Sequence, residues 1–153
     1  MKKGRSEQSP KRRIFLSFAR RDAKPAREFL RSLGSQFEVR QSPSPRKLRS
    51  KATSLERAYN FVENEIRRSD IVVLLLPRKP SLSYSMAYEA GLAKAMEKEV
   101  VAIAPHENWT MHETLLGLSK AQTFTSASSF VSSLKGSVVG GSHAGRAASK
   151  APR

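Results

Sequence analysis

The sequence predicts an α/β fold in which helices cover both faces of a parallel β-sheet. Short apolar segments alternate with segments of helical periodicity along most of the chain. The two central apolar segments, DIVVLLLP (70–77) and EVVAIAP (99–105), are nearly continuous aliphatic runs, as expected for parallel strands buried on both faces. The length of 153 residues suits one domain of this kind.

The first part of this domain is expected to hold two strands and two helices. RIFLSF (13–18) is a short apolar run and predicts the first strand. A helix should follow, with Asp22 as its cap and Gly34 at its end. QFEVR (36–40) alternates as a strand does, and TSLE (53–56) matches a capping box at the start of the second helix.

The second part continues the alternation. Strand 70–77 should be followed by a helix that contains Glu89, and then by strand 99–105. AQTF (121–124) is a weaker edge-strand candidate, and SASSFVSSLKG (126–136) is a weaker last helix. Five parallel strands in three layers predict a flavodoxin-like arrangement with strand order 2-1-3-4-5.

The charge distribution predicts two basic tails around one domain. The net charge is +15, and both ends are basic and rich in polar or small residues. We therefore expect disordered tails at 1–11 and 136–153 and a folded domain at 12–135. Because part of the charge lies in the tails, the composition favours solubility over nucleic-acid binding.

Several site classes have no support in the sequence. The chain has no cysteine, so it has neither disulfides nor thiolate metal sites. It lacks G-x-G-x-x-G, the P-loop motif and G-x-S-x-G. The three histidines show no ligand spacing, so we expect neither a metal nor a bound cofactor. No apolar run has the length of a membrane span, and no signal-peptide pattern opens the chain. The expected location is therefore cytoplasmic, without a membrane partner.

Glu89 breaks the pattern of its helix. On a helical wheel it lies within about 60° of an apolar stripe, which consists of Leu82, Met86, Leu92, Ala93 and Met96. A carboxylate is costly to bury there. Two interpretations remain open. Glu89 faces a cleft at the carboxyl edge of the sheet, where ligands of open α/β folds bind; or it accepts backbone hydrogen bonds from a neighbouring loop.

Two segments carry a resemblance to a known family. RIFLSFARRDAKPAREFLRSL (13–33) resembles the opening of Toll/interleukin-1 receptor (TIR) domains, with a match at Ser17, Phe18, Arg20, Arg21 and Asp22. The segment 66–103 resembles the second half of that pattern, with a Ser-Asp before the buried strand and a glutamate in the next helix. The resemblance covers roughly residues 12–125. It implies that Glu89 is the catalytic glutamate of the NAD-cleaving members.

A second family shares the Glu89 helix. SMAYEAGLAKAMEKEVV (85–101) is similar to the helix of nucleoside 2-deoxyribosyltransferases, whose glutamate attacks the sugar. Both families break a ribosyl N-glycosidic bond. A carboxylate suits this reaction, because it stabilises positive charge that develops on the ribose.

The other expected site residues follow from this chemistry. Arg20, Arg21 and Arg78 are candidates to face a pyrophosphate, with ordinary solvated surface as the alternative. Phe18 and Trp109 are candidates to stack on a base or on nicotinamide, with half-buried packing as the alternative for Trp109. Ser83 and Tyr84, at the start of the Glu89 helix, are predicted to contact the substrate. Many TIR domains carry a tryptophan four residues before the glutamate, and this position is Ser85 here, beside Tyr84. Arg46, Lys47 and Arg49 lie in the basic loop 41–51, which TIR assemblies use for contacts.

Three functions stay open at this point. The first is a TIR-like domain that cleaves NAD as a substrate in signalling or defence, with self-association and a TIR or effector protein as partners. The second is a non-catalytic TIR adaptor that acts by self-association. The third is a nucleoside deoxyribosyltransferase-like enzyme. Nucleic-acid binding through the tails is a weaker fourth, and it would be strongly salt-dependent.

Overall fold

A computed structural model describes residues 10–41, 55–77, 84–104 and 122–137. The elements in chain order are β1 (Arg12–Phe18), the 3-10 turn η1 (Arg20–Asp22), α1 (Ala23–Leu33), the 3-10 turn η2 (Gly34–Gln36), β2 (Phe37–Gln41), α3 (Leu55–Arg68), β3 (Ile71–Leu75), α4 (Tyr84–Ala95), β4 (Glu99–Ile103), β5 (Gln122–Phe124) and α6 (Ala127–Ser137).

The strands form one parallel sheet in the order β2-β1-β3-β4-β5. All five residues of β3 are buried, as the continuous aliphatic run predicted. β5 is only three residues long and pairs with the end of β4. The predicted α/β class with a parallel sheet between helices is therefore confirmed.

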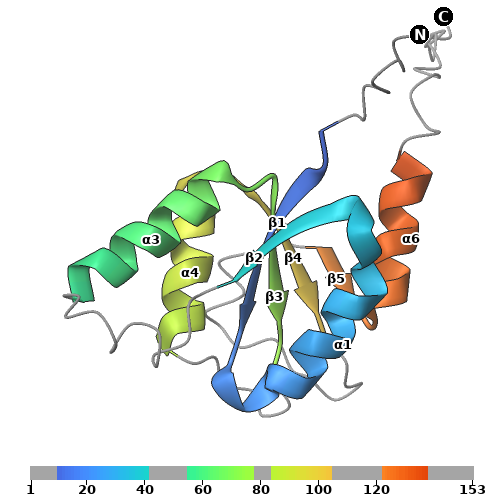
Figure 1. Cartoon of the computed structure of the whole chain (residues 1–153), viewed down its shortest axis with the longest axis horizontal. Helices are drawn as coiled ribbons and strands as arrows, with labels where there is room; N and C mark the ends of the chain where they lie inside the picture. The colour runs from blue at the N-terminus through green and yellow to red at the C-terminus, as the bar shows by residue number, and fades with distance from the viewer. Residues whose placement is uncertain (1–9, 42–54, 78–83, 105–121, 138–153) are drawn as a thin grey trace, which may run out of the picture.

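Helices cover both faces of the sheet, with α1 and α6 on one side and α3 and α4 on the other (Figure 1). Alternate residues of β1 point to the two sides. Ile14 and Leu16 belong to the core cluster that includes Phe29 of α1 and Phe130 of α6. Phe15 belongs to the cluster that includes Ile66 of α3 and residues of α4. These assignments define an α1/α6 face and an α3/α4 face.

The carboxyl edge of the sheet lies at the bottom of Figure 1. There β1 leads into η1, and α4 begins (Figure 1). The opposite edge, where α3 ends and β3 begins, is called the amino edge below. Beyond β3, the Leu76 N–H donates to the Ile103 carbonyl at 2.9 Å, so pairing with β4 continues to the carboxyl edge.

The helix ends differ from the prediction in one place. Asp22 precedes α1, but its side chain makes no capping hydrogen bond. Its backbone (φ −98°, ψ 23°) still belongs to the 3-10 turn η1 and is not extended; an extended N-cap residue directs its carboxylate to the first turn. Gly34 ends α1 with φ 67°, as expected for a residue free to adopt positive φ.

The last helix is capped by two serines. The Ser129 N–H donates to Ser126 Oγ at 3.2 Å, and the Ser126 N–H donates to Ser129 Oγ at 3.3 Å. This reciprocal pair stabilises a helix whose own sequence signal is weak.

Some predictions fall outside the described residues. The capping box at Thr53 lies there, as does most of the basic loop 41–51. The domain limits at 11/12 and 135/136 stay predictions, although α6 continues to Ser137. None of the described helices combines the length and the hydropathy that a bilayer span requires.

Candidate functional site

The predicted ligand edge is formed by segments that are far apart in the sequence. β1, β3 and β4 run parallel and end at the same edge. α4 begins at this edge and packs against β1, β3 and β4. Residues at the ends of β1 and in the first turns of α4 are therefore close to one another on the α3/α4 face (Figure 1).

Glu89 is the sixth residue of α4 and only 3% exposed. It is the one charged side chain that is buried in the part of the chain that the structure describes. Its neighbours on the buried face are Met86, Ala90 and Ala93. This confirms the burial expected from the helical wheel. Glu89 interacts with another group of the protein, so a purely structural role has to be tested by experiment.

Small residues and an aromatic contact position α4. Ala90 and Ala93 face the sheet, so the helix can lie close to β1, β3 and β4. On the outer side, Tyr88 meets Tyr59 of α3 edge to face, with 4.9 Å between ring centroids. Burial raises the pKa of the Tyr88 hydroxyl, and the Glu63 carboxylate raises it further.

Ser17, near the end of β1, has an exposed fraction of zero. It pairs in register with Leu74 of β3. It lies two residues after Phe15, so its side chain is on the α3/α4 face, the side of the sheet that α4 covers. Its Oγ has no hydrogen-bond partner.

Asp22 provides the second buried polar atom without a partner. Among the described residues, only Ser17 Oγ and Asp22 Oδ2 are buried and lack a hydrogen bond. Both lie at or just beyond the end of β1. Since buried polar atoms are nearly always paired, the two unsatisfied atoms distinguish the carboxyl edge from the rest of the described chain.

The remaining predicted site residues are placed as follows. Arg20 and Arg21 are exposed on η1, at the carboxyl edge. Tyr84 is the first residue of α4 and is 86% exposed. Phe18 packs against the core of the α1/α6 face, on the other side of the sheet from α4. Outside the described residues lie Arg46, Lys47, Arg49, Arg78, Ser83 and Trp109. The roles of all these residues stay predictions.

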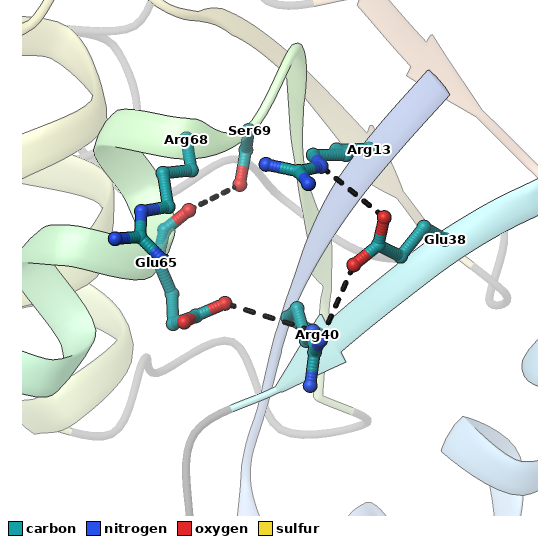
Figure 2. A pocket seen from close by; sticks show the side chains of 6 residues that line it. All are labelled: Arg13, Glu38, Arg40, Glu65, Arg68 and Ser69. Atoms are coloured by element: carbon teal, nitrogen blue, oxygen red, sulfur yellow. Dashed lines mark hydrogen bonds and ion pairs between the residues drawn. The ribbon is translucent and has the colours of Figure 1, made fainter. Parts of the chain in front are cut away.

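A hollow lies at the amino edge, on the α3/α4 face, and is lined by Arg13, Glu38, Arg40, Glu65, Arg68 and Ser69 (Figure 2). Arg13 Nε donates to Glu38 Oε2 at 3.2 Å, and Arg40 Nη2 donates to Glu38 Oε1 at 3.3 Å. Arg40 Nε lies 3.8 Å from Glu65 Oε2 on α3. The hollow is therefore walled by an ion-pair chain that connects β1, β2 and α3.

Two further polar side chains at the amino edge have hydrogen-bond partners. Ser69 Oγ donates to the Glu65 carbonyl at 2.6 Å. The Asp70 carboxylate accepts from the Arg13 N–H at 2.8 Å, and the Asp70 N–H donates back to the Arg13 carbonyl at 2.9 Å. The Arg13 charge holds the pKa of Glu38 below its ordinary value, and hydrogen bonds from Arg40 and Arg13 add to this effect.

Two features of these edges were not identified as sites from the sequence. One is the unsatisfied Ser17 hydroxyl, although a serine on the inner side of RIFLSF is a detectable signal. The other is the amino-edge network, for which the alternation of Glu38 and Arg40 around Val39 is the only local sign. No group of three or more metal-ligating side chains occurs in the described ranges.

Comparison with known proteins gives likeness of structure only. No family model matches the chain, and no curated protein matches its sequence. A conserved protein from Enterococcus faecalis V583 is similar with a TM-score of 0.65 and 16% identity, over 84% of this chain and 99% of that one.

Two similar structures have assigned activities. The CMP N-glycosidase BcmB of Clostridium botulinum has a TM-score of 0.53 and 18% identity, over 81% of this chain and 98% of that one. A 2-deoxyribosyltransferase from Leishmania mexicana has a TM-score of 0.56 and 14% identity, over 85% and 99%. The likeness to deoxyribosyltransferases is thus supported at the level of the fold, and these comparisons do not support the TIR resemblance.

Proposed function

We propose that this protein breaks or transfers the N-glycosidic bond of a nucleoside or nucleotide, with Glu89 as the catalytic carboxylate. The observation that carries this proposal is a carboxylate with 3% exposure, in the first half of a helix that starts at the carboxyl edge of a parallel sheet. The fold likeness to an N-glycosidase and to a deoxyribosyltransferase supports the same chemistry. The third of the three functions predicted from the sequence is therefore favoured over TIR-type NAD cleavage.

The proposed reaction centres on the sugar carbon C1′. The C1′–N bond breaks, its electron pair goes to the base nitrogen, and C1′ acquires oxocarbenium character. The Glu89 carboxylate stabilises this positive charge or bonds to C1′. Water then supplies the new C1′–O bond in a hydrolase, whereas a nitrogen of a second base supplies a new C1′–N bond in a transferase; either one releases a proton. Where Glu89 has bonded to C1′, that bond breaks in the same step and its electron pair returns to the carboxylate.

The leaving group distinguishes the substrates. Cytosine leaves as an anion unless it receives a proton, so a CMP-type substrate needs a proton donor. Nicotinamide leaves NAD⁺ as a neutral molecule and needs none. NAD⁺ therefore remains in the substrate panel, and Arg20 and Arg21 at the carboxyl edge are the predicted contacts for its pyrophosphate.

The test is base release from CMP, from a 2′-deoxynucleoside with a second base as acceptor, and from NAD⁺. Glu89→Gln keeps the size of the side chain and removes its charge. We expect turnover to fall at least ~10²-fold, or about 3 kcal/mol of transition-state stabilisation, with an unchanged or higher melting temperature.

Glu97→Gln is the matched control, because Glu97 is exposed in the turn after α4. It should retain parental turnover. If Glu89→Gln lowers the melting temperature and leaves turnover unchanged, Glu89 is structural. If the parent itself releases no base from any of the three substrates, self-association, as predicted for an adaptor, is the better account of the protein.

A further inference from the structure

Two buried serines of this chain have opposite hydrogen-bonding states. Ser69, 4% exposed at the amino edge, donates its hydroxyl hydrogen to the Glu65 carbonyl. Ser17, fully buried near the carboxyl edge, has no partner for its Oγ. A hydroxyl that is buried without a partner costs free energy, and an apolar side chain of the same size would avoid that cost. The Ser17 hydroxyl therefore calls for a role outside folding.

The position of Ser17 relates it to Glu89. Ser17 lies on the α3/α4 face, beside Leu74 of β3. α4 packs on this side against both β1 and β3, and Glu89 lies on the buried side of α4. Ser17 and Glu89 therefore lie on the same side of the sheet. Ser17 is the second-to-last residue of β1, and Glu89 is in the first half of α4, so both belong to the half that leads to the carboxyl edge.

We propose that Ser17 is a substrate-contacting residue whose hydroxyl hydrogen-bonds a hydroxyl of the ribosyl group on which Glu89 acts. This inference rests on the proposed function. Serine offers one donor and two acceptor positions, which match a sugar hydroxyl that can also donate and accept. Once C1′ lies at the Glu89 carboxylate, the hydroxyls on the other ring carbons of the sugar lie within a few bonds of it. A site that hydrogen-bonds such a hydroxyl discriminates against sugars that lack it.

The test compares the same substitution at the two serines. Ser17→Ala should leave the melting temperature of the free protein unchanged or raise it, and should lower kcat/KM about tenfold for the substrate that the parent accepts best. Ser69→Ala should do the reverse, with a lower melting temperature and parental kcat/KM. Ser17→Cys keeps a heavy atom in place of Oγ but is a weak donor, so its kcat/KM should match that of Ser17→Ala.

The outcomes separate this inference from the proposed function. If the parent releases base and Ser17→Ala has parental kcat/KM, the Ser17 contact is wrong while the function stands. If the parent releases no base from any substrate, the function is wrong. The contact is then tested by the shift in melting temperature that ribose 5-phosphate or CMP produces. A shift in the parent that shrinks in Ser17→Ala supports the contact, and an equal shift or no shift in the parent overturns it.

Discussion

Polar side chains at the two edges of the sheet differ in whether their hydrogen bonds are satisfied. At the amino edge, Glu38 is bonded to Arg13 and Arg40, and the Asp70 carboxylate accepts from a backbone N–H. At the carboxyl edge, Ser17 and Asp22 each have a buried side-chain oxygen without a partner. Both regions belong to one sheet and share strand β1, so the two ends of the same strand differ in how their polar groups are satisfied.

The difference in hydrogen bonding indicates that the polar groups of the amino edge stabilise the fold and that those of the carboxyl edge do not. Paired polar groups contribute modestly to the free energy of unfolding, whereas unpaired buried ones reduce it. A ligand can supply the missing partners, so unsatisfied groups concentrate at sites of binding. The hollow in Figure 2 lies at the amino edge, and its glutamates already neutralise Arg13 and Arg40. It has less capacity to bind an anion than its arginine content suggests.

The largest effect on the free energy of unfolding is expected when the aspartates of the two edges, Asp70 and Asp22, are compared. Asp70→Ala removes the acceptor of the Arg13 N–H and should cost about 1 kcal/mol of unfolding free energy. Asp22→Ala removes a side chain without a capping bond and should cost no more than about 0.5 kcal/mol, the contribution of its charge at the start of α1. Urea denaturation of both variants measures the difference, and equal losses would contradict the contrast between the edges.

A smaller effect is expected from two glutamates of α3. Glu65 is mostly buried and pairs with Arg40 across the hollow. Glu63 is more exposed and pairs with Arg67 one turn away, at 2.6 Å. Glu65→Gln should lose up to about 1 kcal/mol and Glu63→Gln about 0.3 kcal/mol. Both should have parental turnover, because neither lies at the carboxyl edge; reduced turnover at unchanged stability would place the active site at the hollow.

The smallest effect is expected in how the melting temperature depends on pH. The pKa of Glu38 is lowered from 4.5 in the folded protein, chiefly by the Arg13 charge. The stability that this carboxylate contributes is present above pH 4.5 and is lost as the pH falls through the lower folded pKa. Glu38→Gln should therefore flatten the melting temperature against pH below 4.5, and added salt should shrink the difference, because the pair is exposed. Parallel curves for parent and variant would show that the pair does not stabilise the fold.

The parts of the molecule that the sequence predicted are those that depend on local periodicity. The run 70–77 indicated a strand buried on both faces, and the helical wheel placed Glu89 on the inner side of its helix. The features that the sequence did not predict depend on contacts between distant segments. The state of Ser17 follows from how α4 covers β1, and the Arg13–Glu38 pair follows from the register of β1 against β2.

Phe18 and Asp22 show a second reason why the sequence alone does not fix side-chain contacts. Phe18 was predicted to stack on a ligand from its place near the carboxyl edge. Strand alternation places it on the α1/α6 face, and its contact with a ligand stays a prediction. Asp22 has a residue type that suits an N-cap, but the preceding 3-10 turn gives it the wrong backbone angles. In both cases, the local backbone geometry decides which groups the side chain can contact.

The strand order also has a consequence for folding during synthesis. β1 is a central strand, but its partner β3 follows about fifty residues later in the chain. Until β3, α3 and α4 have left the ribosome, β1 can pair only with β2, and Phe15 on its other face has no cover. The nascent chain thus exposes an apolar strand edge and an apolar face for several seconds at ordinary rates of translation. Insertion of β3 beside β1 closes the open edge, and α3 and α4 cover Phe15. This non-local pairing is therefore the step that commits the chain to its native sheet.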